Sequence, residues 1–176
     1  TIANLALAYA QLGYKTILCD ADLRKPVMHK LFGIKRVPGL VDLVLERATL
    51  EEVIHPSDIE NLYLLPAGNL PPNPSELLGS KRMKLVLDEL KERFEKIFFD
   101  APPVIAVTDA TVLGSSMDGM LFVVNSGHTF KELVSHSKSL MDQGKMPLLG
   151  AIVNNVSPDN MSGSYYYYHK YYHYKY

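Results

Sequence analysis

The chain has 176 residues, 47% of them hydrophobic, which is enough for one domain with its own core. Its formal net charge of −1 gives no reason to expect nucleic acid as a partner. The single cysteine, Cys19, excludes an internal disulfide framework and a cysteine-rich zinc site, and no apolar run reaches the roughly 18–20 residues of a membrane span.

The first third of the chain alternates apolar runs with breaks. Residues 1–12 are rich in Ala and Leu and predict a helix that Gly13 ends. The apolar run 15–20 ends on an acid and predicts a strand buried on both faces. Residues 23–45 predict short helices interrupted by prolines, and residues 50–55 predict a further helical turn or two.

The middle of the chain contains the clearest helix signal. Residues 62–65 predict a second strand, followed by a loop of Pro, Gly and Asn over 66–73. Asn73 as N-cap, Pro at the first helical position and Glu76 predict a helix start in the style of a capping box. One apolar face then continues at spacings of three and four; it comprises Met83, Val86, Leu87, Leu90 and Phe94.

The remaining elements repeat the same alternation. Residues 96–100, 120–125 and 148–154 predict the third, fourth and fifth strands. A capping box at 129–132 predicts a helix that Gly144 ends. Residues 157–164 are rich in Ser, Asn and Gly and predict a polar linker.

This order predicts an α/β fold with a mostly parallel sheet and helices on both faces. We expect a domain over 1–156 and a flexible linker with a tyrosine-rich tail over 157–176. Ligands of such sheets bind outside the carboxyl ends of the strands. The predicted strands end on Asp20, Asp100, Asn125 and Asn154, so we expect two carboxylates and two carboxamides at one rim, although polar residues often end strands by chance.

The acids at this rim suggest phosphate chemistry. Asp20 and Asp22 are separated by one residue just past a strand, where both can face one metal ion or accept a proton, and Arg24 and Lys25 beside them can hold a phosphate. Asp100 follows an apolar strand and precedes Ala-Pro-Pro, as does an acid that holds Mg²⁺ in nucleotide-hydrolysing folds. An ordinary strand-ending or helix-capping Asp is the alternative.

The tyrosines are unevenly distributed: eight of the 11 lie in the last twelve residues. A core does not need this arrangement. The eight are Tyr165, Tyr166, Tyr167, Tyr168, Tyr171, Tyr172, Tyr174 and Tyr176.

Together these segments resemble the bacterial tyrosine kinases, a family within the P-loop, ParA/MinD-like superfamily. Residues 17–26 (ILCDADLRKP) resemble the A′-type Walker motif of the family, and residues 98–104 (FFDAPPV) resemble its Walker B motif. Residues 68–78 (GNLPPNPSELL) resemble a signature between the two motifs, and residues 1–13 resemble the helix after a P-loop. The terminal tyrosine cluster resembles the autophosphorylated tail of the capsule- or exopolysaccharide-type kinases of Gram-positive bacteria.

The resemblance implies roles for individual residues. Asp20 would position Mg²⁺ and accept the tyrosine proton, Asp22 would lie near the metal and the γ-phosphate, and Asp100 would hold Mg²⁺ through water. Arg24 and Lys25 would belong to the basic stretch beside the nucleotide.

Further roles follow from the same resemblance. Thr1 would directly follow the P-loop Ser/Thr, and Asn154 would contact adenine, although Asn155 is an equal candidate by position. The eight tail tyrosines would be the phosphoacceptors.

The resemblance also implies a function: an ATP- and Mg²⁺-dependent tyrosine autokinase that regulates capsular or exopolysaccharide synthesis and export. Its expected partners are a membrane activator or adaptor with a cytoplasmic C-terminal segment, further copies of itself in a ring, and a cognate tyrosine phosphatase, but not nucleic acid. The expected location is the cytoplasm, at the inner face of the cell membrane through the partner.

One part of the family pattern is missing from the 176 residues. No stretch reads G-x-x-x-x-G-K-[ST], the loop whose amides, Lys and hydroxyl bind ATP. The nearest segment, 78–82, has one Gly and the wrong order. We therefore expect a fragment that lacks the first strand and the P-loop, binds ATP very weakly and is inactive by itself.

Two other functions remain open from the sequence. A ParA/MinD-like ATPase would share the fold and Walker B but would not explain the tyrosines, and a non-catalytic docking module would be phosphorylated in trans by an intact copy. The tail could also be a low-complexity end, or bind a metal through His169 and His173, four residues apart.

Overall fold

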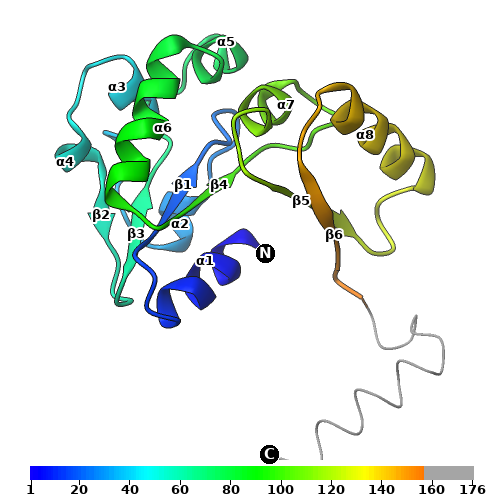
Figure 1. The fold of residues 1–176 in the computed structure, drawn as a ribbon, viewed down its shortest axis with the longest axis horizontal. Coiled ribbons are helices and arrows are strands. Elements are labelled where there is room, and N and C mark those ends of the chain that lie inside the picture. The colour runs from blue at the N-terminus through cyan, green and yellow to red at the C-terminus, as the bar shows by residue number, and fades with distance from the viewer. Residues whose placement is uncertain (157–176) are drawn as a thin grey trace, which may run out of the picture.

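The computed structural model describes residues 1–156, whose strands form two sheets (Figure 1). The larger sheet has the order β2–β3–β1–β4, with β1 at Thr16–Asp20, β2 at His55–Pro56, β3 at Leu62–Leu65 and β4 at Lys96–Asp100. The strands β3, β1 and β4 are parallel, and β2 is a short antiparallel edge. The predicted linker and tail lie outside the described residues.

A second, two-stranded sheet contains β5 (Met120–Asn125) and β6 (Leu148–Asn154), which are also parallel. All five predicted strands are thus confirmed, and the mostly parallel α/β fold with them. The expectation of a single rim is wrong, because within residues 1–156 β4 and β5 are not hydrogen-bonded to each other and belong to different sheets. The two acids therefore end strands of one sheet, and the two asparagines end strands of the other.

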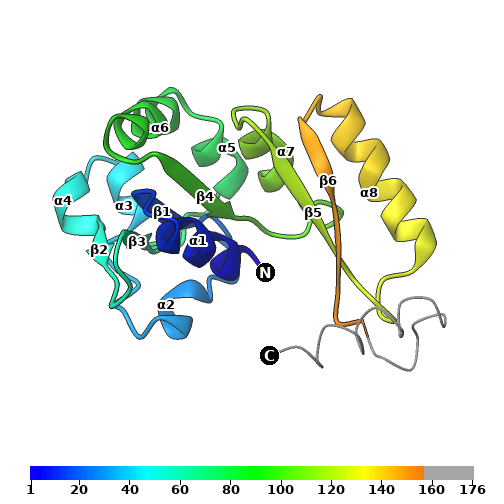
Figure 2. The ribbon, with the colours of Figure 1, turned by 60° about the horizontal axis from the view of Figure 1, so that its bottom comes forward.

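Helices lie on both faces of the larger sheet, as Figures 1 and 2 show. The helix α1 lies on one side, and α3 and α6 lie on the other. The helix α8 packs beside β5 and β6. The helices are α1 Ile2–Gln11, α2 Met28–Leu31, α3 Leu40–Val44, α4 Leu50–Val53, α5 Pro74–Leu78, α6 Lys81–Arg93, α7 Asp109–Gly114 and α8 Lys131–Gln143.

Alternate side chains of β1 enter two separate hydrophobic clusters, one on each face. Ile17 and Cys19 pack in the cluster under α3 and α6, whereas Leu18 packs in the cluster under α1 and α2. All five residues of β1 are buried. A strand covered on both faces favours apolar residues on both, which is why residues 17–19 form a continuous apolar run rather than an alternating one.

Two local predictions were wrong, and two short elements were not predicted. The predicted helix 73–94 is divided into α5 and α6, because Gly79 ends the first and Ser80 caps the second. The predicted box at 129–132 is absent, because the Thr129 hydroxyl accepts the Asn125 N–H at 3.3 Å and Phe130 occupies the N-cap. Neither β2 nor α7 was predicted, since two residues and six residues are too few to show a periodicity.

The N-cap of α6 supplies a measurable contribution to stability. Ser80 Oγ accepts the Met83 N–H at 3.1 Å, which satisfies one of the free amides at the start of α6. We expect Ser80→Ala to lower the free energy of unfolding by about 1 kcal/mol. Urea denaturation measures this change, and Ser139→Ala, at an exposed mid-helix position of α8, is the matched control that we expect to change little. Equal stability of Ser80→Ala and the wild type would contradict the capping role.

Candidate active site

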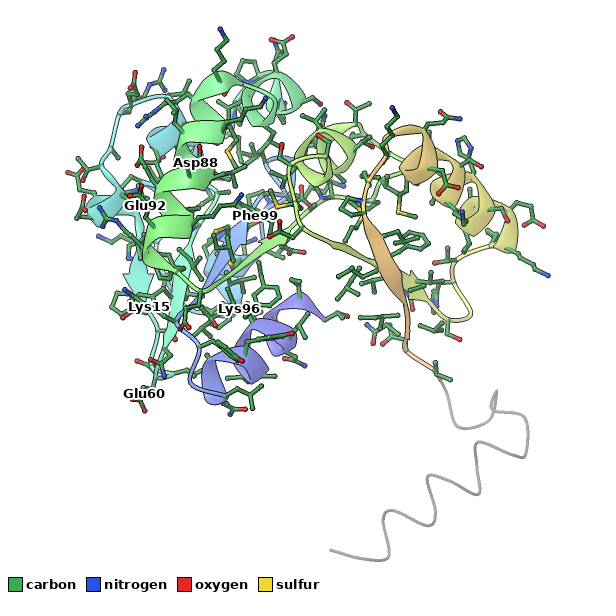
Figure 3. The ribbon with its side chains drawn as sticks, in the orientation of Figure 1. Lys15, Glu60, Asp88, Glu92, Lys96 and Phe99 are labelled. Atoms are coloured by element: carbon green, nitrogen blue, oxygen red, sulfur yellow. The ribbon has the colours of Figure 1, made fainter. Side chains whose placement is uncertain are left out.

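Two carboxylates end adjacent strands of the larger sheet. Asp20 and Asp100 are register partners at the carboxyl ends of β1 and β4. Lys15 and Lys96 mark the other end of these strands, and Figure 3 shows both at the edge away from α5 and α7. Since parallel strands place their carboxyl ends together, the sheet brings the two acids side by side, as the sequence predicted for this pair.

Asp20 is fully buried and only half satisfied. Its Oδ2 accepts the Met28 N–H at 3.1 Å, whereas its buried Oδ1 has no hydrogen-bond partner within the described residues. Burial raises the pKa of Asp20 to about 6, the nearby N–H groups of Met28 and Asp22 oppose this rise, and the charges of Asp100 and Asp22 add to it. The site thus contains an acid whose charge is poorly compensated by the protein.

The other two carboxylates differ in environment. Burial raises the pKa of Asp100 above its ordinary value, with the charge of Asp22 as the next cause. Asp22 lies in the loop after β1, where its Oδ1 accepts the N–H groups of Arg24 at 3.1 Å and Lys25 at 2.9 Å. Like charges gathered at one place favour a cation between them.

Arg24 is engaged by a residue that the sequence analysis did not identify. Its Nε and Nη2 donate to Asp109 Oδ2 and Oδ1 at 2.8 and 3.0 Å. Asp109 is fully buried in the first turn of α7 and also accepts the Ser75 hydroxyl of α5. Burial tends to raise the pKa of Asp109, but the hydrogen bonds from Arg24 and Ser75 outweigh it and leave the pKa below its ordinary value.

The remaining predicted site residues lie at different places. Thr1 is the N-cap residue of α1. Lys25 is exposed beside the acidic loop. Asn154 ends β6 in the other sheet as the register partner of Asn125, and the neighbouring Asn155 donates from Nδ2 to Asn125 Oδ1 at 3.0 Å. The predicted adenine contact of Asn154 stays a prediction.

The carboxylates are suited to binding a hydrated Mg²⁺ ion and do not form a complete set of protein ligands for a metal. Within residues 1–156 no group of three or more His, Cys, Asp and Glu side chains can hold a metal by itself. Mg²⁺ commonly keeps several waters and binds one or two carboxylates plus substrate phosphates. The unpartnered Oδ1 of Asp20 is an oxygen that such an ion would satisfy.

A second buried acid shapes the segment 66–73. Asp42 of α3 accepts the N–H of Gly39 at 3.0 Å, and the N–H and Nδ2 of Asn69 at 3.2 and 2.8 Å. Gly68 has a φ of 83°, and a Cβ there would lie 2.4 Å from Asp42 Oδ2, so this position requires glycine. The segment 68–78, which resembles the family signature, thus begins with a loop that is hydrogen-bonded to Asp42 of α3.

Sequence reasoning missed Asp42 and Asp109 because buried and exposed acids look alike in a single sequence. The only available signal was position: each acid lies in the first turn of a short apolar helix, where carboxylates are favourable. That signal does not reveal a partner 85 residues away, as Arg24 is from Asp109.

The comparisons with known proteins agree with this geometry. Residues 1–135 match the family model of an AAA domain. The chain is 42% identical over 154 residues to the tyrosine-protein kinase YwqD of Bacillus subtilis, a match that covers 88% of this chain and 65% of YwqD. It is 34% identical over 158 residues to the tyrosine-protein kinase CpsD of Streptococcus agalactiae, covering 89% of this chain and 68% of CpsD. The chain belongs to the bacterial tyrosine kinase family.

Two solved structures share the fold of this chain. The chimerical protein CapA2B2 superposes with a TM-score of 0.86 at 39% identity, covering 88% of this chain and 69% of that one. The septum site-determining protein MinD of Pyrococcus horikoshii, complexed with Mg-ADP, has a TM-score of 0.72 at 22% identity over 93% of this chain and 68% of MinD, which concerns the fold alone. The chain spans 65% of the length of YwqD.

Proposed function

We propose that this chain is the partial catalytic domain and the substrate tail of an ATP- and Mg²⁺-dependent protein tyrosine autokinase. The observation that carries the proposal is the group of three carboxylates, Asp20, Asp22 and Asp100. Burial first, and neighbouring negative charge second, raise the pKa values of Asp20 and Asp100. Asp20, with its free Oδ1, and Asp22 would approach the metal directly, and Asp100 would act through water. Bound Mg²⁺ would supply charge neutralisation for the phosphates of ATP.

The roles of the residues follow from the needs of phosphoryl transfer, which depends mainly on positioning and electrostatics. A free tyrosine has a pKa of about 10, so a nearby base assists its deprotonation as attack begins. With a pKa of about 6, Asp20 is ionised at neutral pH and accepts a proton more readily than an ordinary Asp. Thr1, Lys25 and Asn154 would contact the nucleotide, with Arg24 contributing its charge from its place beside Asp109.

The acceptors would be the eight tyrosines of the tail. A cluster of acceptors increases the chance that one reaches an active site, that of a neighbouring copy included. Each phosphate adds up to about −2 charge, and the repulsion would separate an assembly such as a ring of copies. The proposed partners are a membrane activator and a tyrosine phosphatase. The proposed location is the inner face of the membrane, and the proposed role is control of capsule or exopolysaccharide synthesis. Within residues 1–156, no helix is long and apolar enough to cross a bilayer.

A mixing experiment tests the proposal. We expect the chain alone with Mg·ATP to show no autophosphorylation, since it contains no Gly-Lys-Ser/Thr loop. Added to intact YwqD and Mg·ATP, it should be labelled within residues 165–176, as mapped by mass spectrometry. A variant with all eight tail tyrosines replaced by Phe keeps Tyr9, Tyr14 and Tyr63 and should lose the label.

Three outcomes would contradict the proposal in different ways. Label on Tyr9, Tyr14 or Tyr63 would refute the tail as the substrate. Absence of label in the mixture, with YwqD itself phosphorylated, would favour a ParA/MinD-like ATPase. Autophosphorylation of the chain alone would refute its inactivity.

A further inference from the structure

The loop that carries Asp22 is connected to α7 through one buried carboxylate. Asp109 receives two hydrogen bonds from the Arg24 guanidinium and one from the Ser75 hydroxyl. The carboxylate is fully buried, whereas 43% of the Arg24 side chain is exposed. Asp109 therefore joins three segments that are distant in the sequence: 20–26, 74–78 and 109–114.

The backbone of Arg24 in turn contacts Asp22. The N–H groups of Arg24 and Lys25 both donate to Asp22 Oδ1. This arrangement orients the Asp22 carboxylate and leaves its second oxygen without a hydrogen bond from the described residues. The direction of that oxygen depends on the backbone of residues 22–25, which the side-chain anchor of Arg24 restrains.

The anchor has the chemistry of a rigid support. A two-point guanidinium–carboxylate pair is directional as well as strong. The pKa of Asp109 lies below its ordinary value, so the pair is ionised at neutral pH. Groups that hold a metal-binding side chain from behind commonly change metal affinity about 10- to 100-fold when they are removed.

We propose that Asp109 is a positioning residue of the phosphoryl-transfer site: by anchoring Arg24, it orients the Asp22 carboxylate toward the metal ion. The inference rests on the proposed function, since Asp22 matters here only if a divalent cation binds beside it. It assigns to Arg24 a second task besides the charge that it presents to a nucleotide.

Mn²⁺ binding to the full 176-residue chain, followed by electron paramagnetic resonance, tests the metal part. We expect Arg24→Gln and Asp109→Asn each to weaken Mn²⁺ binding about 10-fold or more. The double variant should be no weaker than either single variant, because both remove one interaction. The control is Arg93→Gln, which removes the Arg93–Glu51 ion pair, 2.6 Å long, between α6 and α4 and should leave Mn²⁺ affinity unchanged.

Amide hydrogen exchange, measured by NMR without metal, tests the positioning part. The Arg24 side chain is 43% exposed, so Arg24→Gln should retain the fold. In this variant we expect the amides of residues 24 and 25 to exchange about 10-fold faster. The amides of α6 should not change. Unchanged exchange at residues 24 and 25 would overturn the inference.

The two measurements also separate this inference from the proposed function. Suppose that Arg24→Gln speeds amide exchange but leaves Mn²⁺ affinity unchanged, while Asp20→Asn weakens Mn²⁺ binding. This result would overturn the inference and show that the Arg24–Asp109 pair only stabilises the loop. If neither Asp20→Asn nor Asp100→Asn changes Mn²⁺ binding, the proposed metal site is refuted, and the exchange rates alone decide whether Asp109 orders the loop.

Discussion

Replacing Asp20 with asparagine is expected to stabilise the fold by about 2 kcal/mol at pH 7 in the absence of divalent cations. The pKa of Asp20 is raised from 3.8 to about 6, which corresponds to a penalty of up to about 3 kcal/mol for the charged form. We reduce this figure to about 2 kcal/mol because the asparagine amide is itself a polar group whose burial costs free energy. The asparagine oxygen can still accept the Met28 N–H.

The pH dependence of this effect has a definite sign. Between pH 4 and pH 6 the folded state binds more protons at Asp20 than the unfolded state does, so the wild type loses stability as the pH rises through this range. The gain from Asp20→Asn should therefore be greatest above pH 6 and small near pH 4. Urea denaturation at pH 4.5 and pH 7 in EDTA measures the two differences.

A matched control separates the site from general charge effects. Asp88 lies exposed on α6, where Figure 3 labels it, and Asp88→Asn should change stability by less than about 0.5 kcal/mol. A lower stability of Asp20→Asn than of the wild type at pH 7 would show that the carboxylate is compensated in the fold. The gain in stability that we expect for Asp20→Asn, together with an expected loss of function, is typical of replacing a functional residue that destabilises the fold.

Replacing Asp42 with alanine is expected to destabilise the fold by about 3 kcal/mol. The side chain accepts three hydrogen bonds, from the Gly39 N–H and from the N–H and Nδ2 of Asn69. Hydrogen bonds to a charged group are worth about 1.5–3 kcal/mol each, and a buried donor left unpaired costs about 1–3 kcal/mol. The Asn69 amide can turn to water, so the effect is smaller than the sum of the three.

The loss should be concentrated in the loop that Asp42 pins. Two backbone hydrogen bonds, Leu40 N–H to Pro66 O at 2.8 Å and Val41 N–H to Ala67 O at 3.0 Å, join the same segments. We therefore expect limited proteolysis of Asp42→Ala to begin within 66–73 before global unfolding, and the urea midpoint to fall. Asp88→Ala, an acid-to-alanine change at an exposed helical site, is the control. Equal stability of the two variants would refute the role of Asp42.

Much of the fold was predictable because burial dictates composition at short range. Short apolar runs bounded by polar residues and turns indicate strands, so the five predicted strands were identified correctly. The division between α5 and α6 was missed because the apolar face of α6 continues the spacing expected of one helix, and only the cap at Ser80 marks the break. The separation of β4 from β5 was missed because strand pairing depends on contacts between distant residues.

The candidate site was also predictable in part: the sequence indicated which residues form it but not their surroundings. The sequence by itself determined that Asp20 and Asp100 end apolar strands, that Asp22 and Arg24 follow in one tight loop, and that the acids share an edge of the sheet. These facts depend on residue order and on the common direction of parallel strands. Only the tertiary structure decided how each charge is compensated.

That compensation differs sharply among the acids. Asp109 is neutralised by Arg24, Asp42 is satisfied by backbone and side-chain amides, and Asp20 retains a buried oxygen with no partner in residues 1–156. An isolated aspartate carries the same charge and hydrogen-bonding capacity at every position in a chain. Its energy is decided by the dielectric, donors and charges around it, which come from segments brought together only by folding.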